Sequence, residues 1–571
     1  MNKFLLFCFF SFCAVITHAQ STYYWVGGAP LAPQNISTLS NWNSSPDGTG
    51  SSRSSSTGAD ILVFDGTNYG GATPTTGTDS VYLNSSISCA QLKFINGAKI
   101  IFKRNTSGTS TLTIAGDGTM AEDFVIEAGS SLKLSDGPGS QIIAMAATNT
   151  GRVSGDFTMS TSLQAGIRNT TAGNPGSLVF TSGANFYTNI TASPSAAYPF
   201  GNATQSSERW VVFEAGASLY YDGGSSPFGS TSAGQPPFQP IEFRAGSNFY
   251  VRTSNLATAA GVFTNRKAFA NVILLNGATL TADGSINRID TLTISAGSTF
   301  TTHTSGQTVI LGDLVVHGTL GAAPTSTNEI VLAGNIPQTI SGTGTIAVSS
   351  LMVTDGAAVT LNKNIAVNRT VNVNGKLDFG TYQITGDGTF TAKNAVAAAN
   401  GNATRSAGAY LLTGVSGAAG LSRGITVSGT GLQPGTRVVS YTTNADSIYI
   451  SLPAITNGTG TAVTFGAEEA TLETSNPAGF DPLTGSVTVT GEQTYGRINY
   501  VINTTTTKPF GLNTGGTTTV EAASVLFNAP VTTNAIALIY ENLQATSGKI
   551  NIRPTDSLSL MTGATLSGTY N

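Results

Sequence analysis

The stretch Asn271–Thr302, NVILLNGATLTADGSINRIDTLTISAGSTFTT, contains one short phrase twice. An alternating apolar run leads to a turn at Gly277, and a second alternating run begins at Leu280. The same order returns 20 residues later, with a turn at Gly297 followed by Phe300. A repeated glycine turn between strands of period-2 hydrophobicity is typical of a solenoid. We therefore expect Leu280 and Phe300 to stack in the core of successive coils.

Copies of this phrase extend along most of the chain, and we interpret their glycines as structural turns that need a positive φ. The spacings from Gly216 to Gly318 are 30, 31, 20 and 21 residues, as expected for short coils with loops of variable length. The predicted fold is all-β, a right-handed parallel β-helix with an inserted small all-β module. The predicted turn glycines are Gly97, Gly129, Gly183, Gly216, Gly246, Gly277, Gly297 and Gly356.

Composition agrees with a solenoid and argues against several other classes. The chain has 571 residues, of which 67 are glycine, and only 10% are charged. That length is too great for one compact core, but a solenoid grows by adding coils. The formal net charge of −4 gives no basic surface for nucleic acid. We expect no nucleic-acid partner.

The first 19 residues have the features of a secretory signal peptide: a charge at Lys3, an apolar run and a small-x-small site that ends at Ala19. No later apolar run is long enough to span a membrane. We expect a secreted protein, extracellular or on the outer cell surface, without a transmembrane segment. Removal of the leader leaves Cys89 alone, so no disulfide framework is expected and Cys89 is interpreted as a small buried residue.

Four segments follow the signal peptide. Residues 20–79 are predicted to cap the open end of the solenoid, with Trp25 and Trp42 in its core or, alternatively, as a sugar-stacking platform. Residues 80–393 form the β-helix, and residues 394–468 form the inserted module or spacer. Its start, 395–409, is interpreted as a low-complexity linker, followed by four or five strands. Residues 469–571 continue the β-helix and stop within a coil phrase, which suggests truncation.

The stretch between Phe186 and Phe238 is the richest in aromatic residues and is interrupted by prolines. Loops that project from a rigid scaffold are where binding usually resides, although aromatics at strand positions also form core stacks. We name six residues here as candidate ligand contacts. They are Tyr187, Tyr198, Trp210, Tyr220, Tyr221 and Phe228.

Catalytic motifs are lacking in the sequence. The mature chain keeps two histidines, His303 and His317, at a spacing that does not suit a metal site. Asp60 and Asp65 bracket an apolar run rather than converge. We therefore predict no enzyme, cofactor or metal. A β-helical polysaccharide lyase or glycoside hydrolase is the alternative, and an ice-binding surface built from Thr-x-Thr strands is a lesser one.

One coil phrase carries a resemblance to a known family. Residues 334–346, GNIPQTISGTGTI, and the following coils to residue 388 resemble those of large autotransporter-like, adhesin-like β-helical surface proteins exported by a type IX secretion route. The opening YYWVGG, NWN and GADILVFDG is similar to their N-terminal start. Residues 414–466 resemble small all-β modules of bacterial and phage surface proteins. The resemblance implies an adhesin-like role, with glycans, extracellular matrix or cell-surface proteins as partners bound weakly at many points.

Overall fold

The computed structural model of the chain is almost entirely β-structure. Within the described residues, the single helical element is a 3-10 turn, η1 (Leu39–Asn41). The predicted signal peptide lies outside them. The described residues are 20–27, 34–56, 58–67, 79–116, 121–146, 148–169, 176–191, 198–201, 209–224, 227–228, 240–252, 267–275, 277–282, 284, 286–322, 325–395, 401–416, 421, 424–441, 446–481, 483–504, 518–527 and 549–551.

Most strands pair in parallel with an equivalent strand of the next repeat. On one side, β23 (Asn271–Leu274) pairs with β26 (Leu292–Ile294). On a second side, β24 (Thr279–Thr281) pairs with β27 (Thr299–Thr302), which places Leu280 beside Phe300. Both side chains are buried, so the stacking predicted from the repeated phrase is confirmed.

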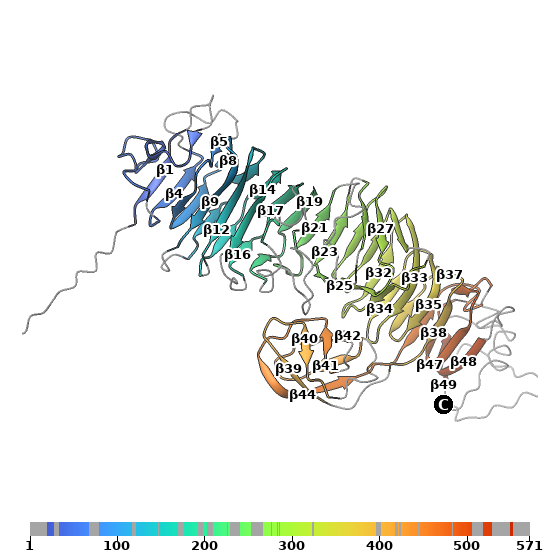
Figure 1. Cartoon of the computed structure of the whole chain (residues 1–571). Helices are drawn as coiled ribbons and strands as arrows, with labels where there is room; N and C mark the ends of the chain where they lie inside the picture. The colour runs from blue at the N-terminus through green and yellow to red at the C-terminus, as the bar shows by residue number, and fades with distance from the viewer. Residues whose placement is uncertain are drawn as a thin grey trace, which may run out of the picture.

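A third strand completes the repeats around residues 267–332. In this region, β25 (Ile286–Ile289) pairs with β28 (Gln307–Ile310), and β28 pairs with β31 (Glu329–Leu332). The strands from β4 (Ile61–Asp65) to β47 (Gln493–Ile502), outside the inserted module, form long parallel sheets that we call the parallel stack. Figure 1 shows its elongated shape. Three parallel ladders along one axis are compatible with the predicted coils.

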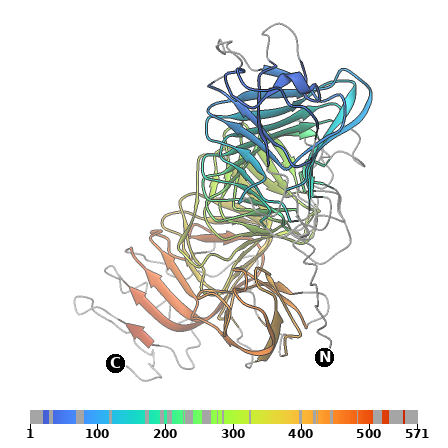
Figure 2. The same cartoon turned by 90° about the vertical axis from the view of Figure 1, so that its left-hand side faces the viewer.

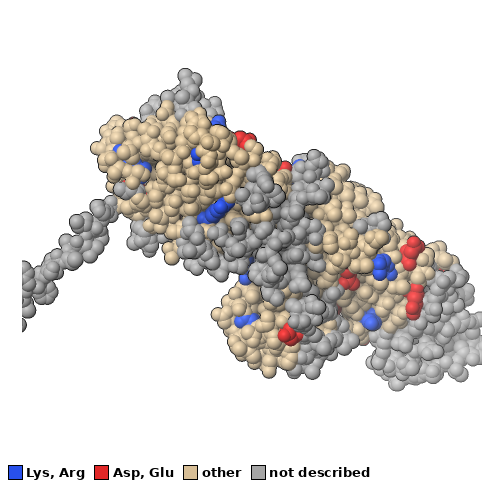
Figure 3. Space-filling model, in the orientation of Figure 1, with Lys and Arg blue, Asp and Glu red and all other residues tan. Residues whose placement is uncertain are grey.

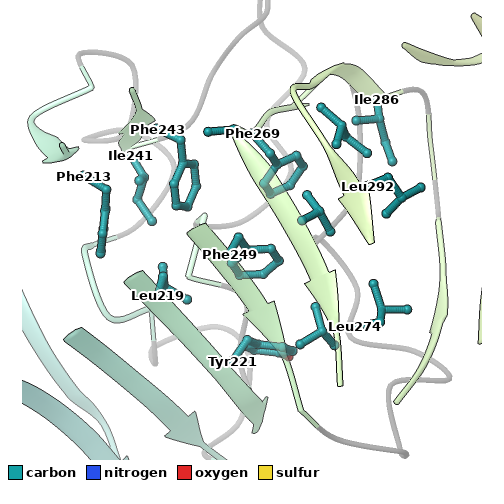
Figure 4. Close-up of a cluster of buried hydrophobic side chains, with 14 of the residues drawn as sticks. Phe213, Leu219, Tyr221, Ile241, Phe243, Phe249, Phe269, Leu274, Ile286 and Leu292 are labelled. Atoms are coloured by element: carbon teal, nitrogen blue, oxygen red, sulfur yellow. The ribbon is translucent and has the colours of Figure 1, made fainter. Parts of the chain in front are cut away.

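The interior of the parallel stack is one continuous apolar core. Because strand residues alternate between the two faces, each inward side chain lies against its equivalents in the neighbouring repeats. The rings of Phe180 and Phe213 stack at 4.4 Å, and Phe213 lies 5.4 Å from Phe243. Figure 4 shows Phe213, Phe243 and Phe269 following one another in this core. Each fully buried phenylalanine stabilises the fold by roughly 1.5–3 kcal/mol.

The predicted turn glycines all have a left-handed backbone, with φ between 64° and 84°. Gly297 illustrates the reason, because its φ of 77° is strained for any residue that carries a Cβ. The prediction of structural turns is therefore confirmed for all eight. They are Gly97, Gly129, Gly183, Gly216, Gly246, Gly277, Gly297 and Gly356.

The N-terminal segment closes one end of the parallel stack. β1 (Thr22–Trp25) pairs in parallel with β4 and antiparallel with β3 (Trp42–Asn43), the last strand of its sheet. The rings of Trp25 and Trp42 lie 5.1 Å apart, and both are buried. Their burial agrees with the predicted cap and excludes a sugar-stacking platform. The parallel ladder already begins at β4, before the predicted boundary at residue 80.

The inserted module is an antiparallel sheet with its own core. An isolated bridge between Thr426, in the first strand of the sheet order, and Arg437, the residue before the last strand, brings the two edges of the sheet together. The linker predicted over 395–409 is wrong for 401–405, because these residues form a strand that pairs with residues 458–463. The strands, in sheet order, are β41 (Thr426–Ser428), β44 (Gly458–Gly466), β39 (Gly401–Arg405), β40 (Leu411–Thr413), β43 (Ile448–Ile450) and β42 (Val438–Tyr441).

The parallel ladders pass the module without a break. β36 (Lys376–Asp378) pairs directly with β45 (Thr471–Thr474), and β38 (Thr389–Ala392) pairs with β47. The module is thus an insertion between two successive repeats, as predicted, and Figure 2 shows it beside the parallel stack. β48 (Thr518–Phe527) and β49 (Lys549–Asn551) extend the ladder in parallel. The last coil phrase, around Gly563, lies outside the described residues.

Candidate binding surface

Four of the six candidate ligand contacts are buried. Trp210, Tyr221 and Phe228 belong to the apolar core and are 0% exposed, and Tyr198 is 8% exposed. The prediction that these four side chains contact a ligand is therefore wrong. Strand alternation explains Tyr221, because its neighbour Tyr220 takes the outward position.

The other two candidates lie on the outer face of one sheet, where the structure adds a third residue. Tyr187 on β17 (Asn185–Ile190), Tyr220 on β19 (Ser218–Gly224) and Tyr250 on β21 (Asn248–Val251) are in register. The Tyr187 and Tyr220 ring centroids are 4.7 Å apart, as are those of Tyr220 and Tyr250. The interplanar angles of 12° and 7° make them a regular stack, which we call the tyrosine ladder. Its rings are half-buried.

Sequence reasoning missed Tyr250, although the signal was present. Tyr250 is the last residue but one of the phrase RAGSNFYV around Gly246, and Tyr220 stands at the same place in EAGASLYY around Gly216. Counting four residues from each turn glycine would have placed both tyrosines in one outward column.

An arginine–aspartate pair fixes one side of the tyrosine ladder. The Arg252 Nε and Nη2 each donate a hydrogen bond of 2.7 Å to a different carboxylate oxygen of Asp222. The guanidinium carbon lies 4.7 Å from the Tyr220 ring centroid and 5.4 Å from that of Tyr187. A cation at this distance is attracted by the ring, so Arg252 restrains both tyrosines while its charge is balanced by Asp222.

A column of amides runs along the other side. Asn185, Ser218, Asn248 and Asn271 occupy equivalent positions in four successive repeats. The Asn271 amide donates to the side-chain oxygen of Asn248 at 3.0 Å, and the Asn185 amide donates to the Asp156 carboxylate at 2.9 Å. We call Asn185, Asn248 and Asn271 the asparagine column.

Two phenols of the tyrosine ladder, those of Tyr187 and Tyr250, have a raised pKa. Desolvation by burial is the main cause that raises the pKa of Tyr187 and of Tyr250 above the ordinary value. Nearby Asp156 and Tyr220 raise the Tyr187 pKa further, against the opposite effect of Arg252. These two phenols therefore remain hydrogen-bond donors as well as acceptors.

The ionisable groups singled out in the sequence are engaged in structural contacts. Asp60 forms an ion pair of 2.7 Å with Arg53, and Asp65 accepts hydrogen bonds from Thr67 and Asn96. Burial raises the pKa of the Cys89 thiol to about 12. Among the residues that the structure describes, no three His, Cys, Asp or Glu side chains gather as a metal-binding group. Figure 3 shows isolated charges on a largely uncharged face.

The inserted module is docked on an outward apolar stripe of the parallel stack. Val309, Val331 and Met352 occupy equivalent positions on three adjacent strands and pack against Val439 and Tyr449 of the module. All five are at most 9% exposed. The stripe would be an exposed hydrophobic patch without the module, so this packing holds the module in place.

Polar contacts flank this apolar interface. The Arg288 Nη1 donates a hydrogen bond of 2.6 Å to the Tyr410 hydroxyl of the module, and its Nε lies 2.7 Å from the Asp290 carboxylate. A crevice between Arg288, Tyr410 and Tyr449 has a volume of about 20 Å³, which is room for about one water. It is too small for a sugar or a cofactor.

Comparison of the chain with protein-family models, with curated proteins and with solved structures gives no match. No helix in the part of the chain that the structure describes is long and apolar enough to cross a membrane. The function proposed below therefore rests on the groups that this surface presents. They are aromatic edges, phenol groups and amides on a rigid sheet face.

Proposed function

We propose that this chain is a secreted, adhesin-like surface protein without catalytic activity, whose parallel stack is a right-handed parallel β-helix. Its function would be weak, multivalent binding of glycans or of extracellular matrix and cell-surface proteins along the sides of the rod. The tyrosine ladder is the observation that supports this proposal, because three partly exposed rings in register on a rigid face form an extended contact surface. Weak contacts repeated along one scaffold raise the overall affinity through effective concentration.

The restrained geometry of the tyrosine ladder also favours binding. Its rings are stacked on one another and held by Arg252, so little side-chain freedom remains to be lost when a ligand binds. Tyrosine combines a large apolar ring with a polar tip, which suits a partly wet interface. Export by a type IX route remains part of the proposal and rests on the resemblance of the coil phrases.

The proposal is tested with the purified full-length chain on an array of glycans and on immobilised matrix proteins. We expect binding that strengthens with the density of the immobilised ligand. A chain that binds neither class at any density would contradict an adhesive role. The alternative of a polysaccharide lyase or hydrolase is tested on the same sample by assays for reducing ends and unsaturated products, either of which would overturn the non-catalytic assignment.

One observation supports the lesser alternative of an ice-binding surface. Thr279, Thr299, Thr319 and Thr345 are in register on four successive repeats, and their side chains lie on the outer face. Such a row could order water at the spacing of the strands, about 4.8 Å. Inhibition of ice recrystallisation by the wild-type chain, abolished by Thr299→Leu, would favour this function.

A further inference from the structure

The direction of the tyrosine ladder sets the direction of any ligand that uses all three rings. The three tyrosines come from adjacent strands, so the ladder crosses the strands and follows the axis of the parallel stack. The asparagine column follows the same axis on neighbouring strand positions. An extended chain molecule lying along that axis would meet one phenol at each of three repeats, about 4.8 Å apart, and an asparagine beside the first and the third of them.

The stacking decides which atoms face such a ligand. Each ring covers the face of its neighbour at 4.7 Å, so the middle ring of Tyr220 presents its edge and its hydroxyl rather than its face. Within the described residues, no hydrogen bond engages the hydroxyls of Tyr187, Tyr220 or Tyr250. A row of free phenols beside amides suits a ligand that is rich in hydroxyl groups.

The charges around the ladder indicate whether an uncharged or an anionic ligand rich in hydroxyl groups fits this surface. The strands that carry the ladder, Arg252 directly after β21, and the two preceding strands, β11 (Ser131–Ser135) and β14 (Asp156–Thr161), contribute two basic and two acidic side chains, so these charges balance. The guanidinium of Arg252 is already held by both carboxylate oxygens of Asp222. An anionic polymer would have to break that pair to use the charge of Arg252. The four charged residues are Lys133, Asp156, Asp222 and Arg252.

We infer that the tyrosine ladder and the asparagine column together bind one uncharged polysaccharide chain that lies along the axis of the parallel stack. This inference rests on the proposed function and narrows it to one ligand class and one surface. The phenols act as hydrogen-bond donors and acceptors to sugar hydroxyls, and the amides of the asparagine column do the same on the adjacent side. Recognition of this kind depends little on salt, because no net charge is neutralised.

The test is affinity electrophoresis of the full chain in gels that contain soluble β-glucan, mannan, xylan or polygalacturonate. We expect at least one of the three uncharged polymers to retard the chain, and an approximately tenfold rise in salt to leave the dissociation constant unchanged. Polygalacturonate should not retard it. Retardation by polygalacturonate alone, lost at high salt, would overturn the inference.

Two variants locate the site. The triple variant Tyr187→Phe, Tyr220→Phe, Tyr250→Phe keeps the rings and removes the hydroxyls, and should bind at least about tenfold more weakly because up to three hydrogen bonds are lost. Tyr220→Ala interrupts the stack and should weaken binding by at least as much. Tyr82→Phe and Tyr82→Ala are the matched controls, since Tyr82 is a half-buried tyrosine of β5 (Asp79–Tyr82) outside the ladder. Circular dichroism verifies that every variant folds.

The outcomes separate this inference from the proposed function. Wild-type affinity in the triple phenylalanine variant would show that the phenols are not the site. Binding of matrix proteins or charged glycans without binding of uncharged polymers would contradict the inference and leave the adhesive function standing. Failure to bind any of these ligands would contradict both.

Discussion

Arg437 of the inserted module is tied to Asp355 of the parallel stack, 82 residues earlier in the chain. Its Nη1 donates a hydrogen bond of 2.9 Å to the Asp355 backbone oxygen and lies 3.9 Å from the carboxylate Oδ2. Its Nη2 lies 3.0 Å from a carboxylate oxygen of Glu468. The Arg437 side chain is 8% exposed and that of Asp355 is 0% exposed, so a buried charge pair joins the two parts.

Replacing Arg437 by methionine should weaken the docking of the module. The substitution leaves Asp355 buried without its cation, which typically destabilises by about 3–5 kcal/mol. The expected result is faster hydrogen exchange in β28 and β31, which carry the docking stripe, with unchanged exchange in β4 at the far end. The double variant Arg437→Met, Asp355→Asn should recover part of the protection, because no unpaired charge remains. Equal protection in wild type and Arg437→Met would contradict this account.

The burial of Asp355 should also make docking depend on pH. Burial raises the pKa of Asp355 to about 6 from its ordinary value of 3.8, against the lowering effects of the Glu468 backbone N–H and of Arg437. The docked form therefore binds a proton more tightly than an undocked form in which Asp355 meets water. Protonation of Asp355 therefore stabilises the docked form. This stabilisation is fully present below about pH 4 and is lost as the pH rises through about 6.

Calorimetry of the module's unfolding between these pH values measures that contribution. A shift of about two pKa units corresponds to at most roughly 3 kcal/mol. The unfolding temperature of the wild type should fall from acid to neutral pH relative to that of Asp355→Asn, which cannot titrate at this position. Parallel pH profiles for the two proteins would exclude Asp355 as the cause.

The turn glycines permit a comparison within one ladder. Gly297→Ala should destabilise the chain by about 1–2 kcal/mol, because alanine must adopt a φ of 77° there. Gly321→Ala is the control, since the added Cβ would meet no atom within 4 Å and Gly321 has no left-handed backbone. It should be neutral or slightly stabilising. Urea unfolding followed by tryptophan fluorescence gives both values, and an equal loss at the two positions would contradict the backbone explanation.

Local patterns in the sequence were sufficient to predict the repeated architecture. Period-2 alternation and glycine turns are properties of a few neighbouring residues, and so the contact of Leu280 with Phe300 could be predicted. The buried aromatic residues were harder to assign. Tyr220 and Tyr221 are adjacent and chemically identical, and only the register of the sheet places one outside and the other inside.

The docking of the module depends on contacts between distant parts of the chain, and these were not predicted. A partial signal existed in Val309-Ile310 and Val331-Leu332, where two consecutive apolar residues end a strand. Such pairs indicate that both faces of a strand are covered. They do not identify the covering segment, because Val439 and Tyr449 lie about a hundred residues further along the chain.

Deletion of the module should leave the parallel stack folded. The backbone N–H of Ala470 donates a hydrogen bond of 2.8 Å to the Asn394 side-chain oxygen, so the two ends of the insertion already meet. A variant in which a short glycine linker replaces residues 395–469 should keep the pairing of β36 with β45 and of β38 with β47. The circular dichroism of this variant should keep the strand signal, and the signal should melt at the wild-type temperature. Loss of the strand signal would mean that the module is needed for folding.

The same deletion should make the chain associate with itself. Without the module, Val309, Val331 and Met352 form an exposed apolar stripe, and such patches promote association. Light scattering after size exclusion should detect oligomers of the deletion variant. Adding Val309→Thr, Val331→Thr and Met352→Thr should restore the monomer, because threonine is tolerated on outward strand positions. A deletion variant that stays monomeric with the stripe intact would show that the module is not required to shield it.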